Sequence, residues 1–261
     1  MAAEGTDKFV EVTELAGQEI SVEQLDRLCH RYHWAASYCD GKDVVEVACG
    51  GGQGLGLLAT HARSLLGTDI APEVLDRARK TYDDEIRLAV GAADRIDVPS
   101  ATLDVILLFE ALYYLPDPDG FFAEASRVLR PGGVLLITTA NKDLFDFTRS
   151  PHSTRYFGVD ELGRMLQAHG FASRMYGYVD TALLSFRQRM FRPVKFAANR
   201  LRLMPKTMAG KSILKRVVFG KMTSMPNRID GIEYHFQPPT LLVEDKPNTN
   251  FKVIYCAAVK E

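Results

Sequence analysis

Short apolar runs and segments with helical spacing alternate along most of this chain. Residues 21–39 begin with Ser21 and, three residues later, Gln24, a capping-box pattern, and continue with apolar residues three and four positions apart. This pattern predicts a helix. Continuous apolar runs then predict strands at 44–48, 64–68, 86–90, 104–109, 134–139, 171–179 and 251–259. Strands that alternate with helices in this way indicate an α/β fold with a parallel sheet covered on both faces.

Several expected helices carry local signals at their ends. Pro72 stands where the first turn of a helix tolerates proline, and 121–129 is a helical segment that ends at an Arg-Pro-Gly-Gly sequence. Asp160 is expected to cap a helix that runs to His169. Gly170 is expected to end that helix, because glycine accepts the left-handed backbone that follows a helix.

Basic residues are concentrated in one segment. Residues 181–229 hold twelve Lys or Arg and no Asp or Glu, whereas the rest of the chain holds 20 basic and 33 acidic residues, a net charge of −13. The segment lies between the last two predicted strands and therefore reads as an insertion. Apolar positions within it predict an amphipathic helix, with the residues Phe186, Met190, Phe191, Val194 and Ala197. Either this helix is a lid whose apolar face packs on the sheet, or the segment binds phosphate or an anionic membrane.

The composition narrows the class of protein. A hydrophobic fraction of 46% and a charged fraction of 25% are typical of a globular protein. The acidic N-terminus does not resemble a secretory signal and no apolar run is long enough for a membrane span, so we expect a cytoplasmic protein, with peripheral membrane association as the alternative. The four cysteines lack metal-ligand spacing, which predicts buried thiols and no metal.

The most informative stretch joins a predicted strand to a predicted helix. Val44, Val45 and Val47 are followed by glycines at 50, 51, 52 and 54, and apolar helical spacing resumes at Leu55. Glycine accepts positive φ and lacks a Cβ atom, so a ligand can approach bare backbone at the start of a helix. The sequence therefore predicts a ligand-binding turn here.

An acid at the end of the second strand fits two kinds of nucleotide site. Asp69 follows Gly50 by nineteen residues, where a carboxylate would bind a ribose diol. Dinucleotide dehydrogenases share this feature. Their fingerprint needs a third glycine, but Leu55 occupies that position when the pattern is started at Gly50. Residues 54–59 match a relaxed form of this fingerprint that ends in alanine instead of glycine. The match begins inside the predicted helix, and we therefore discount it.

Four ordered segments resemble the class I S-adenosylmethionine-dependent methyltransferases. They are the acid-to-glycine turn 46–52, the strand end 66–70, the ungapped adenine loop 91–99 and the Arg-Pro-Gly-Gly loop 129–134. The resemblance covers residues 44–137 and the final strand. It implies a Rossmann-like, seven-stranded, mostly parallel sheet whose last strand runs antiparallel, interrupted by the helical insertion, and S-adenosylmethionine as cofactor.

The same resemblance implies the cofactor contacts. Asp69 would bind the ribose, and Gly50 and Gly52 would let the backbone approach the methionine moiety. Ala48 replaces the usual first glycine, a change that we expect a negative φ to accommodate, and Ala92 replaces the usual acid of the adenine loop. The expected cofactor-binding residues are Arg31, Tyr32, Glu46, Ala48, Gly50, Gly52, Asp69, Ile70, Ala92, Ala93 and Phe109.

Methyl transfer to a hydroxyl needs alignment and a base. Glu110 ends the fourth predicted strand at the cofactor edge and is the best-placed acid. Segment 109–117 resembles small-molecule and sugar O-methyltransferases, in which a His pair often stands where this chain has Tyr113 and Tyr114. Tyr113 is a candidate catalytic residue, with core packing as the alternative. His235, in the insertion, is a third candidate.

The predicted function is methyl transfer from S-adenosylmethionine to oxygen of a small-molecule or glycan acceptor, phosphate-bearing or lipid-linked if the basic segment binds it. The alternative is a non-catalytic or peripheral membrane-binding module that retained the fold. Nucleic acid is not expected, since the chain outside the insertion is acidic. The expected parts are an N-terminal helical lid, a binding core, an acceptor-side cap and a final core strand, at 1–42, 43–180, 181–250 and 251–261.

Overall fold

The computed structural model describes residues 13, 15–150, 152–184, 186–200, 221–243 and 246–261. The strands are β1 (Glu19–Ser21), β2 (Asp43–Val47), β3 (Ser64–Asp69), β4 (Arg87–Val90), β5 (Leu103–Phe109), β6 (Leu129–Ala140), β7 (Phe171–Asp180), β8 (Met222–Ser224), β9 (Thr240–Leu241) and β10 (Phe251–Lys260). The helices are α2 (Val22–Cys39), α3 (Leu55–Ala59), α4 (Pro72–Tyr82), the 3₁₀ turn η1 (Leu112–Tyr114), α5 (Pro118–Val128), α6 (Val159–Ala168) and α7 (Phe186–Arg200).

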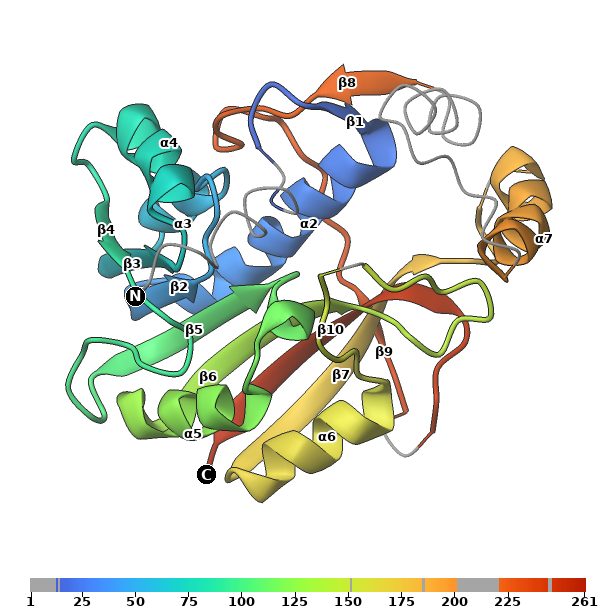
Figure 1. Ribbon diagram of the computed structural model, residues 1–261. Coiled ribbons are helices and arrows are strands. Elements are labelled where there is room, and N and C mark those ends of the chain that lie inside the picture. The colour runs from blue at the N-terminus through green and yellow to red at the C-terminus, as the bar shows by residue number, and fades with distance from the viewer. Residues whose placement is uncertain (1–12, 14, 151, 185, 201–220, 244–245) are drawn as a thin grey trace.

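The described chain forms an eight-stranded sheet in the order β4-β3-β2-β5-β6-β10-β7-β9 (Figure 1). Strands β4, β3, β2, β5 and β6 are parallel, whereas β10 pairs antiparallel with both β6 and β7. The expected α/β class and the antiparallel last strand are confirmed. The expected strand number is one too low for this sheet, because the short strand β9 adds to β7. Strands β1 and β8 form a separate two-stranded sheet.

Helix boundaries follow their local signals, with two exceptions, α5 and α6. Helix α5 begins at Pro118 behind the N-cap Asp117, three residues before the predicted start, and the Arg-Pro-Gly-Gly segment predicted as a loop is part of β6. The Ser21 side chain accepts a hydrogen bond from the Gln24 backbone N–H, and the Gln24 side chain accepts one from the Ser21 N–H, so the capping box of α2 is confirmed. Helix α6 starts two residues earlier than a cap at Asp160 would place it. Its N-cap is Gly158, and Asp160 lies inside the first turn, so the prediction that Asp160 is the cap is wrong. Gly170 follows the helix at φ 79°, as expected.

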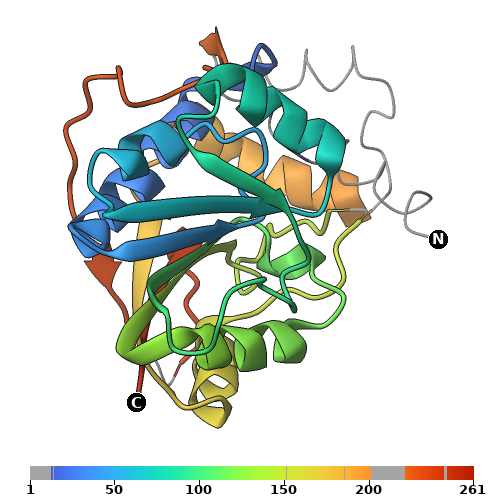
Figure 2. The same cartoon turned by 90° about the vertical axis from the view of Figure 1, so that its left-hand side faces the viewer.

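Two helical layers cover the sheet (Figures 1 and 2). Helices α2, α3 and α4 lie on one face, where Trp34 and Leu28 pack in the same cluster as Leu107 of β5. Helices α5 and α6 lie on the other face, where Phe121 packs in the same cluster as Leu108. This alternation along β5 explains its nearly continuous apolar sequence. The carboxyl ends of β2 to β5 consequently meet at one edge of the sheet.

Helix α7 belongs to the basic insertion and does not pack as a lid. Phe186 and Met190 are 80% and 57% exposed, so of the two alternatives the lid whose apolar face packs on the sheet is wrong. Polar side chains, Gln188 and Arg192, contact the body of the protein instead. Residues 201–220 of the predicted basic segment lie outside the described residues. No described helix has the length and apolar character needed to cross a bilayer.

Candidate functional site

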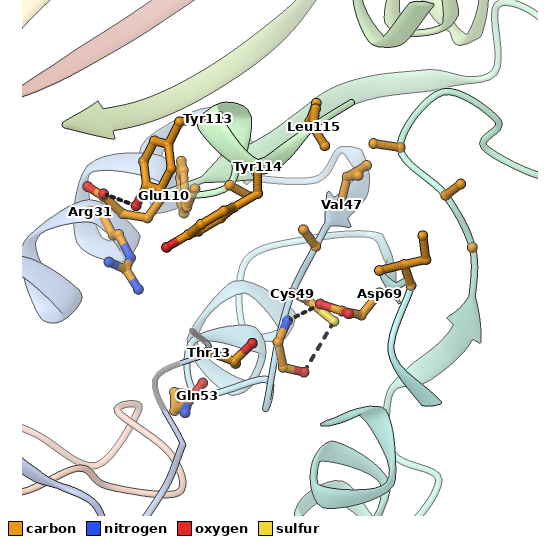
Figure 3. A pocket seen from close by; sticks show the side chains of 18 of the residues that line it. Thr13, Arg31, Val47, Cys49, Gln53, Asp69, Glu110, Tyr113, Tyr114 and Leu115 are labelled. Carbon is orange, nitrogen blue, oxygen red and sulfur yellow. Dashed lines mark hydrogen bonds between the residues drawn. The ribbon is translucent and has the colours of Figure 1, made fainter. Parts of the chain in front are cut away.

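A pocket of about 930 Å³ opens where the parallel strands end (Figure 3). Helix α2, the glycine turn after β2, the loop after β4 and residues 109–117 form its walls. Ligands of open α/β sheets bind at this edge, beyond the carboxyl ends of the strands. The pocket lining includes most of the residues predicted to bind or react: Arg31, Tyr32, Ala48, Gly50, Asp69, Ile70, Ala92, Ala93, Phe109, Glu110 and Tyr113.

The glycine turn carries three residues in the left-handed region. Ala48, Gly50 and Gly52 have φ values of 55°, 58° and 76°. The expectation that Ala48 has a negative φ is wrong, because the chain must reverse sharply after β2 and does so with this residue. A side chain at positive φ costs about 1–3 kcal/mol. Gly52 lies beneath the pocket surface, where a Cβ would stand 3.0 Å from Ala78.

Asp69 connects this turn to the end of β3. One carboxylate oxygen accepts a hydrogen bond of 2.9 Å from the Gly50 N–H, and the other accepts one of 2.9 Å from the Ala71 N–H. The side chain is buried, and this burial raises its pKa although three backbone donors, Gly50, Ile70 and Ala71, oppose the shift. A carboxylate has about four lone-pair sites, so acceptor capacity remains for a donor in the pocket. Asp69 is therefore built to accept hydroxyl groups.

Tyr32 closes the opposite wall and binds an acid beneath it. Its hydroxyl donates a hydrogen bond of 2.5 Å to Oε1 of Glu46, and its ring packs edge-on against Phe109. Gly54 makes room for this ring, since a Cβ there would stand 2.1 Å from it. Glu46 is not a lining residue, but Tyr32 couples it to the wall.

The Glu46 carboxyl is a buried group with an incomplete set of partners. Burial raises its pKa to about 7, although the hydrogen bond from Tyr32 and the charge of Arg31 oppose the shift. Its Oε2 has no hydrogen-bond partner within the described residues. A buried acid of this kind carries its proton near neutral pH unless a donor or cation arrives.

Glu110 stands at the end of β5 with its carboxylate held from two sides. Arg27 Nη2 lies 3.2 Å from Oε1. The Tyr113 hydroxyl donates a hydrogen bond of 2.9 Å to Oε2, which Figure 3 shows. Glu110 itself has φ 53°, an unusual backbone conformation that aims its side chain into the pocket wall. Burial raises the pKa of Tyr113 well above its ordinary value, so this phenol stays protonated and acts as a donor.

Sequence reasoning missed Arg27 and misplaced His235. Arg27 precedes Arg31 by one helical turn on α2, so the helical spacing that placed Arg31 could have indicated both. His235 has an exposed side chain and is not a lining residue. It is Tyr234 that packs against α2, where its ring stacks on His33 at 5.1 Å. His235 is therefore withdrawn as a candidate base. The described residues contain no His, Cys, Asp and Glu cluster suited to a metal.

Comparisons with known proteins agree with this geometry. Residues 45–137 match the family model described as a methyltransferase domain. A protein of Mycolicibacterium smegmatis named a probable S-adenosylmethionine-dependent methyltransferase is 35% identical over 149 residues, 56% of this chain and 55% of that protein. The malonyl-[acyl-carrier protein] O-methyltransferase of Hahella chejuensis is 33% identical over 139 residues, 50% of this chain and 48% of that protein. The chain spans about half the length of these curated relatives.

The solved structures extend the similarity to the whole fold. The YcgJ protein from Bacillus subtilis superposes with a TM-score of 0.57 at 15% identity, over 89% of this chain and 99% of that chain. At this identity the likeness concerns the fold alone. The site must therefore carry the functional argument.

Proposed function

We infer that this chain, which belongs to the class I S-adenosylmethionine-dependent methyltransferases, transfers the methyl group of S-adenosylmethionine to a hydroxyl oxygen of a small-molecule or glycan acceptor. The observation that carries the choice of a hydroxyl is the carboxylate of Glu110, held at the pocket by Arg27 and Tyr113. Relatives named as O-methyltransferases support oxygen as the acceptor atom.

The pocket offers groups suited to each part of the cofactor. Asp69 would accept the ribose hydroxyls with its remaining lone pairs. The turn at Ala48 and Gly50 would bring bare backbone to the methionine moiety, and Arg31 would bind its carboxylate. Backbone groups at Ala92 and the residue after it would meet the adenine. When bound, the cofactor supplies an electrophilic methyl group on a sulfonium.

The protein's own part in the reaction is positioning and proton removal. Glu110 would take the proton that the acceptor hydroxyl gives up as its oxygen is methylated. Arg27 and Tyr113 fix the orientation of that carboxylate before the acceptor arrives.

An experiment with two acceptor classes tests this assignment. The full chain is incubated with methyl-labelled S-adenosylmethionine and either a fatty acid or a methyl hexoside, and the product is treated with alkali, which cleaves methyl esters but not methyl ethers. We expect alkali-stable label from the hydroxyl acceptor. Glu110→Gln should lower that rate about 100-fold or more, because general base catalysis contributes about 10²–10⁴-fold.

Glu73→Gln makes the same change at an exposed position of α4 outside the pocket lining, and this control should keep the wild-type rate. Label recovered only as alkali-labile ester, with full activity in Glu110→Gln, would contradict the hydroxyl assignment, since an ionised carboxylate needs no base. If calorimetry detects neither S-adenosylmethionine nor its demethylated product, the proposal fails and the non-catalytic alternative is favoured.

A further inference from the structure

Helix α7 stands at the edge of the molecule beyond the sheet (Figure 1). Its contacts to the body include the polar side chains of Gln188 and Arg192, while several of its large apolar side chains are exposed. We propose that this outer surface docks the protein onto an anionic lipid bilayer. The interaction is independent of methyl transfer and of the acceptor.

The inner side of α7 is fixed to the body by polar contacts. Arg192 binds Asp146 through two hydrogen bonds, Nε to Oδ2 at 2.9 Å and Nη2 to Oδ1 at 2.8 Å, and both side chains are largely buried. Gln188 donates a hydrogen bond of 2.8 Å to Glu23 of α2. A bidentate pair between an arginine and a carboxylate fixes the relative orientation of the two side chains and also stabilises their contact. The helix is thereby held with a defined side toward solvent.

The outer side presents a row of large apolar groups, which we call the outer stripe. Its members lie three and four positions apart and are Leu183, Phe186, Met190 and Val194, with exposed fractions of 85%, 80%, 57% and 58%. Phe145 and Phe196, 58% and 43% exposed and 6.3 Å apart between ring centroids, extend the apolar surface beside it. Clustered exposure of this kind marks an interaction surface.

The charge of the segment selects among partners. Arg187 and Arg189 are exposed on the same helix, and residues 181–229 include twelve basic residues and no acidic one. Each Lys or Arg near an anionic membrane contributes about 1 kcal/mol of attraction. An apolar stripe flanked by cations is the pattern of a helix that lies in the plane of a bilayer. An anionic lipid surface therefore satisfies both features at once.

Docking through α7 would also orient the pocket. Glu23, which binds Gln188, precedes Gln24 on α2, and Gln24 lines the pocket together with Arg27. Helix α2 therefore contacts α7 through Glu23 and lines the pocket through Gln24 and Arg27. A bilayer bound to the outer stripe would hold the pocket at a fixed distance from the lipid surface.

Vesicle flotation with the full chain tests the proposal. The probes are vesicles of phosphatidylcholine alone and of phosphatidylcholine mixed with phosphatidylglycerol, each over a salt series. We expect binding to the mixed vesicles that is about tenfold or more tighter than to neutral ones at low salt and that weakens as salt is added. Equal binding to both vesicles, or none to the mixed ones, would overturn the proposal.

Two double variants assign the effect to residues. Phe186→Ser with Met190→Ser should weaken binding to the mixed vesicles about tenfold or more. The reason is that moving a large apolar side chain from water into the bilayer lowers the free energy of the bound state. Leu241→Ser with Val243→Ser removes two exposed apolar side chains outside α7 and should leave binding unchanged. Because all four side chains are exposed, each protein should keep its wild-type melting temperature.

The same variants separate lipid from a second copy of the chain. The α7 double variant should have the same mass in solution as the wild type by light scattering. A wild-type dimer that becomes monomeric in that variant, with vesicle binding unaltered, would assign the outer stripe to self-association and overturn the proposal.

Discussion

Tyr32 binds Glu46 through a hydrogen bond of 2.5 Å between two side chains that are almost fully buried. The donor comes from helix α2 and the acceptor from the carboxyl-terminal part of β2. This single contact therefore links the pocket wall to the centre of the sheet, directly below the glycine turn.

Removing the donor is expected to destabilise the fold. Tyr32→Phe leaves Oε1 of Glu46 buried without its donor, which should lower the free energy of unfolding by about 1–3 kcal/mol in urea titrations. Tyr38→Phe, on the same helix but half-buried, is the control and should cost less than about 1 kcal/mol. Equal losses in the two variants would contradict a special role for the Tyr32 hydroxyl.

The raised pKa of Glu46, about 7, predicts a pH dependence of stability. The folded carboxyl holds its proton at pH values where the unfolded one, with a pKa near 4.5, has lost it. The stabilisation is therefore full below about pH 4.5 and is lost as pH rises to about 7, with a total of about 3 kcal/mol. Glu46→Gln should remove this slope from urea titrations across that range. A slope that persists in the variant would contradict the assignment.

Ala48 offers a simple gain in stability. Ala48→Gly relieves a side chain at φ 55° and should raise the free energy of unfolding by about 1 kcal/mol. Ala101→Gly is a matched control, because Ala101 also has φ 55° but is exposed and lies outside the pocket lining. Both variants should gain similarly in thermal unfolding. If Ala48→Gly lowers the stability while Ala101→Gly raises it, the prediction is contradicted. The contacts of the Ala48 methyl group would then stabilise the fold by more than the strained backbone destabilises it.

Asp69 should dominate binding of the cofactor's ribose. In calorimetry with S-adenosylhomocysteine, Asp69→Ala should weaken binding by about 1.5–3 kcal/mol, since hydrogen bonds to a charged group contribute that much. Asp94→Ala, an exposed acid that also lines the pocket, should change affinity by less than about 1 kcal/mol. If the Asp94 variant loses more than the Asp69 variant, the ribose assignment is wrong.

The sequence was sufficient for features set by local chemistry. The capping box at Ser21 and the continuous apolar run of β5 both depend on neighbours within a few residues, and both were predicted correctly. Motif order also predicted most of the pocket lining, because the glycine turn, Asp69 and the adenine loop each follow a parallel strand and so meet at one edge.

Features set by distant contacts could not be predicted in this way. Periodicity found the apolar stripe of α7, but only the pairing of Arg192 with Asp146 determines which side faces the body. The left-handed conformation of Ala48 depends on how sharply the chain leaves β2, and residue type alone favoured the opposite sign of φ. The position of His235 depends on the path of an irregular segment, for which the sequence carries no period.

The fit of Tyr32 over Gly54 has a consequence for protein engineering. A chimera that takes its first helix from a relative would bring a different side chain against position 54, and a relative's turn with any larger residue there would collide with the ring of Tyr32. Helix α2 also supplies Leu28, Trp34 and Ala35 to the same core as β5 and β10. Exchange of the N-terminal segment would therefore succeed only when helix and turn are transplanted as one unit.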